Sequence, residues 1–235
     1  MIHHHDLPRM IQRGLTTSLD ITIYDDDGQT VLPPTAARIS VYAGSITEPI
    51  IDDVVAVHAA TSTYSLLAAA TVDEALSAEW QEHWTLTIDG SAHEFRRTIY
   101  LCRTVPVATL IDADLEDYHA DILDHVEPGT TTLEGYRAKA WAKIEKALIR
   151  RGRRPELVLD GWELTGAHAY KTLEIFFRDS AQSVGDERWK ELSIEYRDMF
   201  DEDWRNINFN YDADEDGRVD EDQNLAARGV IWLTG

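Results

Sequence analysis

The chain has 235 residues, of which 22 are basic and 43 acidic, so its formal net charge at pH 7 is −21. This length is sufficient for one large domain or for two modest ones, each with its own core. The strong negative charge argues against non-specific binding to nucleic acid or to anionic membranes. One cysteine, Cys102, excludes an intramolecular disulfide and is typical of a reducing compartment.

The sequence predicts no membrane segment. No apolar run approaches the roughly 20 residues that a membrane-spanning helix requires, and the first residues lack the charged-then-apolar layout of a signal peptide. We expect residues 1–14 to form an N-terminal arm. Its three adjacent histidines, His3 to His5, are either native or the remnant of a purification tag.

Residues 15–106 are predicted to form a β-sandwich. Turn signals and apolar–polar alternation repeat here at intervals of roughly 8 to 12 residues, which is typical of sandwiches and barrels. The strongest signal is Asp89-Gly90, a hairpin turn between two alternating segments. We predict an antiparallel sandwich of immunoglobulin-like architecture. Its expected strands are Ser18–Tyr24, Ala37–Tyr42, Val54–His58, Thr63–Leu67, Trp84–Ile88 and Phe95–Leu101, with a helical or irregular connector over Val72–Gln81.

Residues 107–208 are predicted to form a helical bundle, because apolar residues recur there with the 3.6-residue period of amphipathic helices. A basic helix is expected to start at a cap on Thr131 or Thr132, with Glu134 completing a capping box after Thr131, and to end at Gly152. Four or so helices of this length make a compact bundle. The others are Asp112–Val126, one or two within Pro155–Asp179, and Asp186–Trp204; Trp141, Trp162, Trp189 and Trp204 are expected to anchor the core.

The basic helix and the turn after it invert the charge of the chain. Eight cations lie within 18 residues: Arg137, Lys139, Lys143, Lys146, Arg150, Arg151, Arg153 and Arg154. Three interpretations stay open: binding to phosphates of a nucleic acid, a solvated helix face, or contact with an acidic face of a neighbouring copy. The overall charge favours the third. The predicted contact residues are Arg150, Arg151, Arg153 and Arg154.

Residues 209–223 are predicted to form an acidic loop of the calcium-binding type. Loop positions 1, 3, 5, 7, 9 and 12 are occupied by Asp212, Asp214, Asp216, Arg218, Asp220 and Gln223, with a glycine at position 6. Carboxylates at this spacing converge on one Ca²⁺, and Arg218 offers its backbone carbonyl. Gln223 stands where a bidentate Glu is usual, so the affinity is expected to fall unless Glu221 or Asp222 substitutes. The alternative is a metal-free turn held by Asx-type hydrogen bonds.

Residues 224–235 are predicted to be an extended C-terminal tail. The segment Arg228–Gly235 is apolar and follows the acidic loop. Such a segment suits strand addition to a partner, in which backbone hydrogen bonds supply the affinity. Ile231, Trp232 and Leu233 are its predicted contact residues.

The stretch AWAKIEKALIRRGRRPELVLDGWELTGAHAYKTLEIFFRD, followed by WKELSIEYRDMFDEDW, resembles the helical core of head–tail connector proteins of tailed bacteriophages. These are also called adaptor, head-completion or neck proteins. The resemblance extends to the segments WTLTIDG and FRRTIYL and to the loop YDADEDG, so it covers most of the chain. All of these are packing patterns rather than catalytic motifs. The β-module departs from the small, purely helical members of the family.

This resemblance implies a ring of subunits, typically dodecameric, docked beneath the portal protein and around the DNA exit channel. It implies a structural protein of the virion neck, made in the host cytoplasm, that joins the portal to the tail or tail-terminator protein and helps to retain packaged DNA. DNA is then expected to pass through the channel without sequence-specific contacts. The 224–235 tail is expected to reach onto the portal.

The sequence therefore predicts an α+β protein of two modules: a β-sandwich, then a helical bundle of the phage connector type with an extended tail. No enzymatic activity is expected, because no nucleophile–base pair or carboxylate dyad stands out in the sequence. The alternative prediction is a calcium-dependent β-sandwich protein that binds a surface or a carbohydrate. Binding to glycans that is lost with EDTA is the property that distinguishes this alternative.

Overall fold

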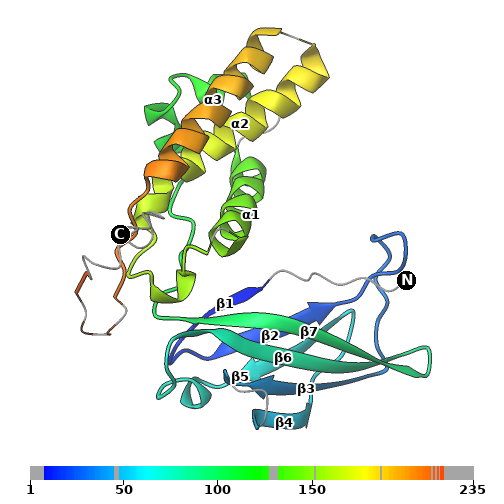
Figure 1. Ribbon diagram of the computed structural model, residues 1–235. Coiled ribbons are helices and arrows are strands. Elements are labelled where there is room, and N and C mark those ends of the chain that lie inside the picture. The colour runs from blue at the N-terminus through cyan, green and yellow to red at the C-terminus, as the bar shows by residue number, and fades with distance from the viewer. Residues whose placement is uncertain are drawn as a thin grey trace, which may run out of the picture. The chain divides into compact units, whose positions relative to one another are not determined.

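The computed structural model describes residues 8–44, 48–126, 132–150, 152–185 and 187–212, together with residues 214, 216, 218 and 219. The chain divides into two compact units. The first, here called the β unit, comprises Met1–Val105 and Arg154–Leu157, and the second, the helical unit, comprises Pro106–Arg153 and Val158–Gly235. Strands build the first unit and helices build the second (Figure 1). The α+β organisation in two modules is therefore present.

The β unit contains two sheets. The larger has the strand order β1-β7-β6-β3-β4, and the smaller pairs β2 with β5. With β2 and β5 in one sheet and β3, β6 and β7 in the other, the grouping is that of strands B–E and C–F–G in immunoglobulin-like sandwiches. The strands are β1 (Arg9–Gln12), β2 (Thr17–Thr22), β3 (Ala36–Tyr42), β4 (Pro49–Val55), β5 (Thr61–Leu66), β6 (Ser77–Ile88) and β7 (Ser91–Cys102).

Inward-facing side chains of the two sheets share one core. Leu19 of β2 and Leu66 of β5 pack in the same apolar cluster as Ile39 of β3 and Trp84 of β6. Along β6 the buried residues alternate with less buried ones, as expected for a strand with one face on the core. Burial of each such side chain stabilises the unit by about 1.5–3 kcal/mol.

The β6–β7 hairpin confirms the strongest turn signal of the sequence. The two strands pair antiparallel up to Ile88↔Ser91, so Asp89 and Gly90 alone form the turn. Both have positive φ angles, 48° and 77°. This is the conformation that a two-residue type I′ turn requires, because its twist matches that of the flanking strands.

Strand β1 differs from the sequence prediction in place and direction. Residues 1–14 are expected to be an arm, but Arg9–Gln12 form a strand that runs parallel to β7, with Arg9 opposite Ile99. The larger sheet is therefore mixed rather than purely antiparallel. A four-residue strand is too short to show a recognisable alternation, and its edge position depends on a partner about 90 residues away.

Two other strand predictions are corrected. Strand β6 begins at Ser77, inside the segment expected to be a connector, and β4 covers Pro49–Val55 rather than Val54–His58. In β6 the buried positions include Glu82 beside Trp80 and Trp84. A charged residue at an inward position interrupts the apolar alternation that would otherwise predict the full strand.

Four charged side chains form an ionic cluster within the β unit, defined by Arg9, Asp20, Glu82 and Arg97. Glu82 is fully buried, and its Oε1 lies 3.5 Å from Arg9 Nε and 3.3 Å from Arg97 Nε. Arg9 also donates to Asp20 Oδ1 at 2.8 Å. Burial raises the pKa of Glu82, while the charges of Arg9 and Arg97 oppose that rise. The cluster connects β1 and β7 to β2 of the other sheet.

The described part of the helical unit contains three α-helices: α1 (Glu134–Arg150), α2 (Thr165–Val184) and α3 (Glu187–Asn206). Helices α2 and α3 lie side by side as a hairpin, and α1 lies along α2 (Figure 1). The hairpin turns at Gly185, which ends α2 with a φ of 73°. No helix of the described residues is long and apolar enough to cross a membrane.

The prediction of a helix over Asp112–Val126 is wrong. Asp112–Val126 forms two short 3-10 turns, η2 (Ala113–Asp117) and η3 (Ile122–His125), with Asp121 between them at a φ of 61°. The many acidic side chains of the segment Asp112–Val126 repel one another at helical spacing, and this repulsion disfavours a continuous helix. Of the one or two helices predicted within Pro155–Asp179, one forms as α2, and the segment before it contains the turns η4 (Pro155–Leu157) and η5 (Trp162–Leu164).

The core of the helical unit is rich in aromatic rings. Phe177 and Tyr196 stack at 5.6 Å between α2 and α3, and Trp189 packs edge-on against Phe177. Trp204 is also buried. Trp162, however, is 72% exposed, so its prediction as a core anchor is wrong.

Candidate subunit interface and metal-binding loop

The start of α1 is fixed by a side chain from outside the helix. Asp112 Oδ2 accepts hydrogen bonds from Thr132 Oγ1 at 2.6 Å and from the Leu133 backbone N–H at 3.0 Å. Its Oδ1 accepts from Arg137 Nε at 2.7 Å. Burial by itself raises the pKa of Asp112, but these hydrogen bonds and the Arg137 charge outweigh it and lower the pKa. The Thr132 hydroxyl also accepts from the Glu134 N–H, which confirms a cap at Thr132.

Helix α1 has two different faces. Ala140, Ile144 and Leu148 are fully buried. Another face borders an open pocket of about 330 Å³, here called the α1 pocket. Its lining includes Glu134, Ala138, Trp141, Ala142 and Glu145 of α1 and His168 of α2.

Three side chains give the α1 pocket its polar character. Trp141 Nε1 donates to Glu145 Oε1 at 3.1 Å, and the Trp141 and His168 rings lie 5.2 Å apart. Burial raises the pKa of Glu145, and the hydrogen bond from Trp141 opposes part of this rise. Trp141 is half-buried on this pocket rather than a core anchor.

His168 presents a hydrogen-bond acceptor. The ring is 1% exposed, and its Nε2 lies 2.9 Å from the Arg137 carbonyl oxygen. Because a carbonyl only accepts, Nε2 carries a hydrogen and donates it. Burial lowers the pKa of His168 although the hydrogen bond to the Arg137 carbonyl opposes this change, so burial favours the neutral ring, in which Nδ1 is the acceptor. Within the described residues Nδ1 has no hydrogen-bond partner.

The four predicted contact arginines differ in their surroundings. Arg150 is exposed at the end of α1, and no described residue bonds its guanidinium. Arg154 is exposed and lies 3.4 Å from Glu156 Oε1. Arg151 lies outside the described residues. The four therefore do not form one uniform basic patch in the described structure.

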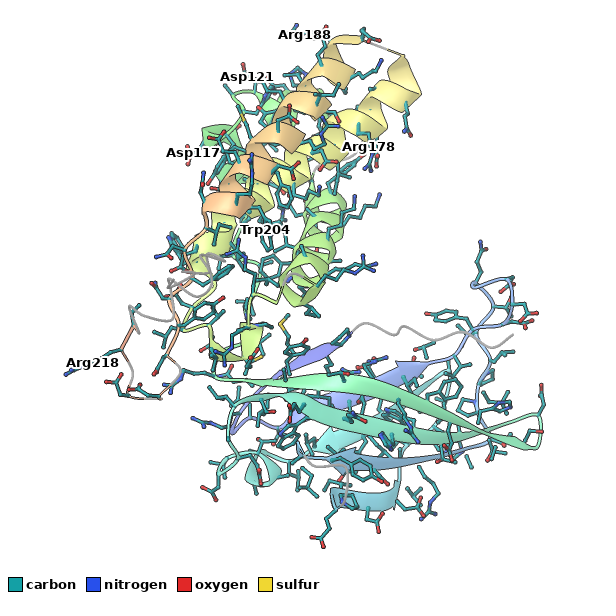
Figure 2. The ribbon with its side chains drawn as sticks, viewed as in Figure 1. Asp117, Asp121, Arg178, Arg188, Trp204 and Arg218 are labelled. Carbon is teal, nitrogen blue, oxygen red and sulfur yellow. The ribbon has the colours of Figure 1, made fainter. Side chains whose placement is uncertain are left out.

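Arg153 acts inside the helical unit. Its Nη2 donates to the Trp204 carbonyl at 3.0 Å and its Nη1 to the Ile207 carbonyl at 3.5 Å. Its guanidinium also lies over the rings of Trp204 and Phe209, at 5.9 and 5.6 Å. A cation at these carbonyls stabilises the C-terminal end of α3, where helix carbonyls lack partners. Figure 2 shows Trp204 near this end of α3, with Arg188 at the opposite end.

The segment after α3 leads directly into the predicted calcium loop. Leu159 donates its N–H to the Asn210 carbonyl at 2.9 Å, and Val158 forms a β-bridge with Tyr211. The Tyr211 hydroxyl donates to the Arg153 carbonyl. These contacts fix the chain immediately before Asp212.

Three predicted calcium ligands come together. One carboxylate oxygen from each of Asp212, Asp214 and Asp216 lies within 4.8 Å of the others; Asp212 is buried and the other two are exposed. Two oxygens on opposite sides of a Ca²⁺ ion lie about 5 Å apart, so this spacing fits that ion. Arg218 points outward from the loop (Figure 2). Asp220 and Gln223 lie outside the described residues.

The metal-free alternative is also compatible with the loop. Asp214 Oδ1 accepts from the Asp216 N–H at 3.1 Å, and Asp216 Oδ1 accepts from the Arg218 N–H at 2.7 Å. Such side-chain-to-backbone bonds hold an acidic turn without a cation. Calcium binding therefore stays a prediction. The tail residues Ile231, Trp232 and Leu233 lie outside the described residues.

A second, polar pocket lies in the β unit. It has a volume of about 230 Å³ and is lined by residues of β3, β4, β6 and β7. The rings of Tyr42 and His83 lie 4.5 Å apart beside it, Arg38 bonds Asp53 at 2.6 Å, and Arg96 is exposed. Scattered residues of different strands make this site, so the linear sequence did not reveal it.

No protein-family model matches the chain, and no curated protein matches it. Among solved structures, the chain is similar to one described as fibronectin(III)-like modules of CbhA from Clostridium thermocellum. The match has 16% sequence identity and a TM-score of 0.23, and it covers 43% of this chain and 96% of that chain. A likeness at this level carries no argument about function.

Proposed function

We propose that the chain is a structural protein of the tailed-phage neck that forms a ring between the portal and the tail and helps to retain packaged DNA. The sequence resemblance of the helical region motivates this role. The observation that carries it is the arrangement on α1, where Arg150, which no described residue bonds, and a pocket bordered by Glu134 and Glu145 occupy different parts of one helix. Unlike surfaces of this kind favour head-to-tail contacts, which form a ring when the rotation between successive copies closes.

The proposed partners follow from this role. Copies of the chain associate with one another, in a ring of about the dodecameric size that the family resemblance implies, and the ring contacts the portal and a tail or tail-terminator protein. DNA passes through without sequence-specific contacts, consistent with the negative charge of the chain. The role is structural rather than enzymatic, and the protein resides in the virion after synthesis in the host cytoplasm.

Electron microscopy and mass photometry with purified portal rings test this proposal. The expected result is a ring of this chain, either alone or docked on the portal. A chain that stays monomeric at micromolar concentration and with every portal tested would contradict the proposal. Portal and capsid genes next to its own gene would give independent support.

A second candidate function is binding to a surface or a carbohydrate through the β unit. The polar pocket beside Tyr42 and His83 favours it, because an aromatic face flanked by polar groups suits the apolar face and hydroxyls of a sugar. Glycan-array binding that is abolished by Tyr42→Ala would support this candidate. Loss of that binding with EDTA would further link it to the acidic loop.

A further inference from the structure

The α1 pocket has the chemistry of a site for a cationic side chain. Its walls are largely apolar, with the Trp141 indole and alanines of α1, and its polar groups include the Glu134 and Glu145 carboxylates. The remaining cation at its edge, Arg137, is already bound by Asp112 and by the Leu110 carbonyl. A ligand that brings donors and a positive charge would satisfy these acceptors.

We propose that the α1 pocket receives the guanidinium of Arg150 from a second copy of the chain. The inference deepens the proposed ring-forming function and rests on it. Arginine suits the pocket because its planar head stacks on an indole while its N–H groups donate to a carboxylate. An aliphatic stem of this length also fills apolar space, which a compact polar ligand does not.

Arg150 is the best candidate among the described arginines of the basic region, and arginine stacks on an indole in a way that lysine does not. Lys139 Nζ lies 3.9 Å from Asp179 Oδ2, and Arg153 donates to the Trp204 carbonyl at the end of α3. Arg154 is paired with Glu156. Arg150 is exposed at the last turn of α1, without a bond from any described residue.

The contact must join different copies. Glu145 and Arg150 are five residues apart on one helix, which separates them by about 7.5 Å along the axis and about 140° around it. An arginine at position 150 therefore points away from the pocket of its own chain. A contact between unlike surfaces of two copies is heterologous and repeats around a ring.

Two charge reversals separate the two halves of the contact. Glu145→Arg removes the acceptor and places a cation in the pocket, whereas Arg150→Glu removes the inserted group. Each variant alone is expected to lose at least tenfold in self-association, measured by mass photometry and sedimentation. Glu145→Gln, which keeps an acceptor for Trp141, is the milder variant if Glu145→Arg does not fold.

Mixing the two variants gives the decisive measurement. Each carries one intact half, so an equimolar mixture is expected to recover association, at least as a 1:1 dimer, which neither variant forms alone. Variants that assemble like the wild-type protein, or a mixture that stays monomeric while the wild-type protein assembles, would overturn the Arg150 contact and leave the ring function standing. A wild-type chain that never assembles, even with portal rings, counts against the proposed function itself.

Lys190→Glu is the matched control. It makes the same change of charge as Arg150→Glu at an exposed position of α3, where the lysine pairs with Glu187 at 2.8 Å. Its self-association is expected to match that of the wild-type protein. Equal loss in Lys190→Glu and Arg150→Glu would show a general charge effect and overturn the specific contact.

Discussion

At the scale of single residues, similar cations of one short region have different roles. Arg150 and Arg153 are three positions apart and indistinguishable by charge. Of these two, only Arg153 binds carbonyls at the end of α3. These carbonyls belong to Trp204 and Ile207, which lie more than fifty residues later in the sequence but are adjacent to Arg153 in the fold. The basic region could be predicted from the sequence, but this division could not, since it depends on a long-range contact.

Replacing Arg153 should destabilise the helical unit. Arg153→Ala removes two charge-assisted hydrogen bonds and two cation–π contacts, so the free energy of unfolding is expected to fall by about 2 kcal/mol. Thermal and urea unfolding under conditions that keep the chain monomeric measure this loss. Arg150→Ala is the control and should change stability by less than about 0.5 kcal/mol; equal effects of the two would contradict the role of Arg153.

Glu163 should make stability depend on pH. Burial and a hydrogen bond with Asp160 raise its pKa from the ordinary 4.5 to about 7, while Asn210 donates to its Oε1. Since the folded pKa is the higher one, the stabilising contribution is complete below about pH 4.5 and is lost as the pH rises through about 7. Glu163→Gln mimics the protonated group, so it should raise the melting temperature at pH 8 and leave it nearly unchanged at pH 4.

The control for this pH dependence is Glu116→Gln, which removes an exposed carboxylate of the same unit. Its melting temperature should follow that of the wild-type protein at both pH values. If the melting temperatures of Glu163→Gln and the wild-type protein differ by the same amount at pH 4 and at pH 8, the raised pKa of Glu163 is contradicted.

At the scale of elements, regular patterns could be predicted and exceptions could not. The β6–β7 hairpin and helices α1, α2 and α3 follow from turn chemistry and apolar periodicity. Strand β1 and the turns within Asp112–Val126 do not, because the first is defined by its partner β7 and the second by repulsion among acids. In the second case Asp112 caps α1 instead of starting a helix of its own.

The ionic cluster of the β unit should be sensitive to the loss of its central acid. Glu82→Ala leaves Arg9 and Arg97 without their buried counter-charge, and breaking a buried pair in this way costs about 3–5 kcal/mol. We expect a large drop in the melting temperature of the β unit. Glu94→Ala, at an exposed position of β7, should have little effect; similar losses in both variants would contradict a specific role for Glu82.

The acidic loop should respond to calcium if its three aspartates bind the ion. Millimolar calcium is expected to raise the free energy of unfolding of the helical unit by about 1–3 kcal/mol, because the ion binds only the folded loop. The same addition should protect the C-terminal segment from proteolysis, and EDTA should reverse both effects. The double variant Asp214→Asn, Asp216→Asn should show neither effect. Identical melting and proteolysis in calcium and EDTA would support the metal-free turn.

At the scale of the whole molecule, the predicted division into a β and a helical module is present, but the candidate site was only partly predicted. The sequence indicated the basic region and three aspartates that do converge. It did not indicate the α1 pocket, because the pocket needs His168 of α2 beside Trp141 and Glu145 of α1. A helical pattern alone predicts which residues share a face, not which face of a neighbouring helix lies opposite.

The four residues Arg154–Leu157 have a consequence for how such a protein can evolve. They belong to the β unit although they follow α1 in the sequence, and the Glu156 carbonyl there accepts the Arg103 N–H at 3.1 Å. The gene therefore encodes the two units as interleaved segments. Recombination near codon 105 would transfer an incomplete β unit, without the buried Pro155 and Leu157. The two units are thus expected to be inherited together, and not to be exchanged separately between unrelated genes by recombination.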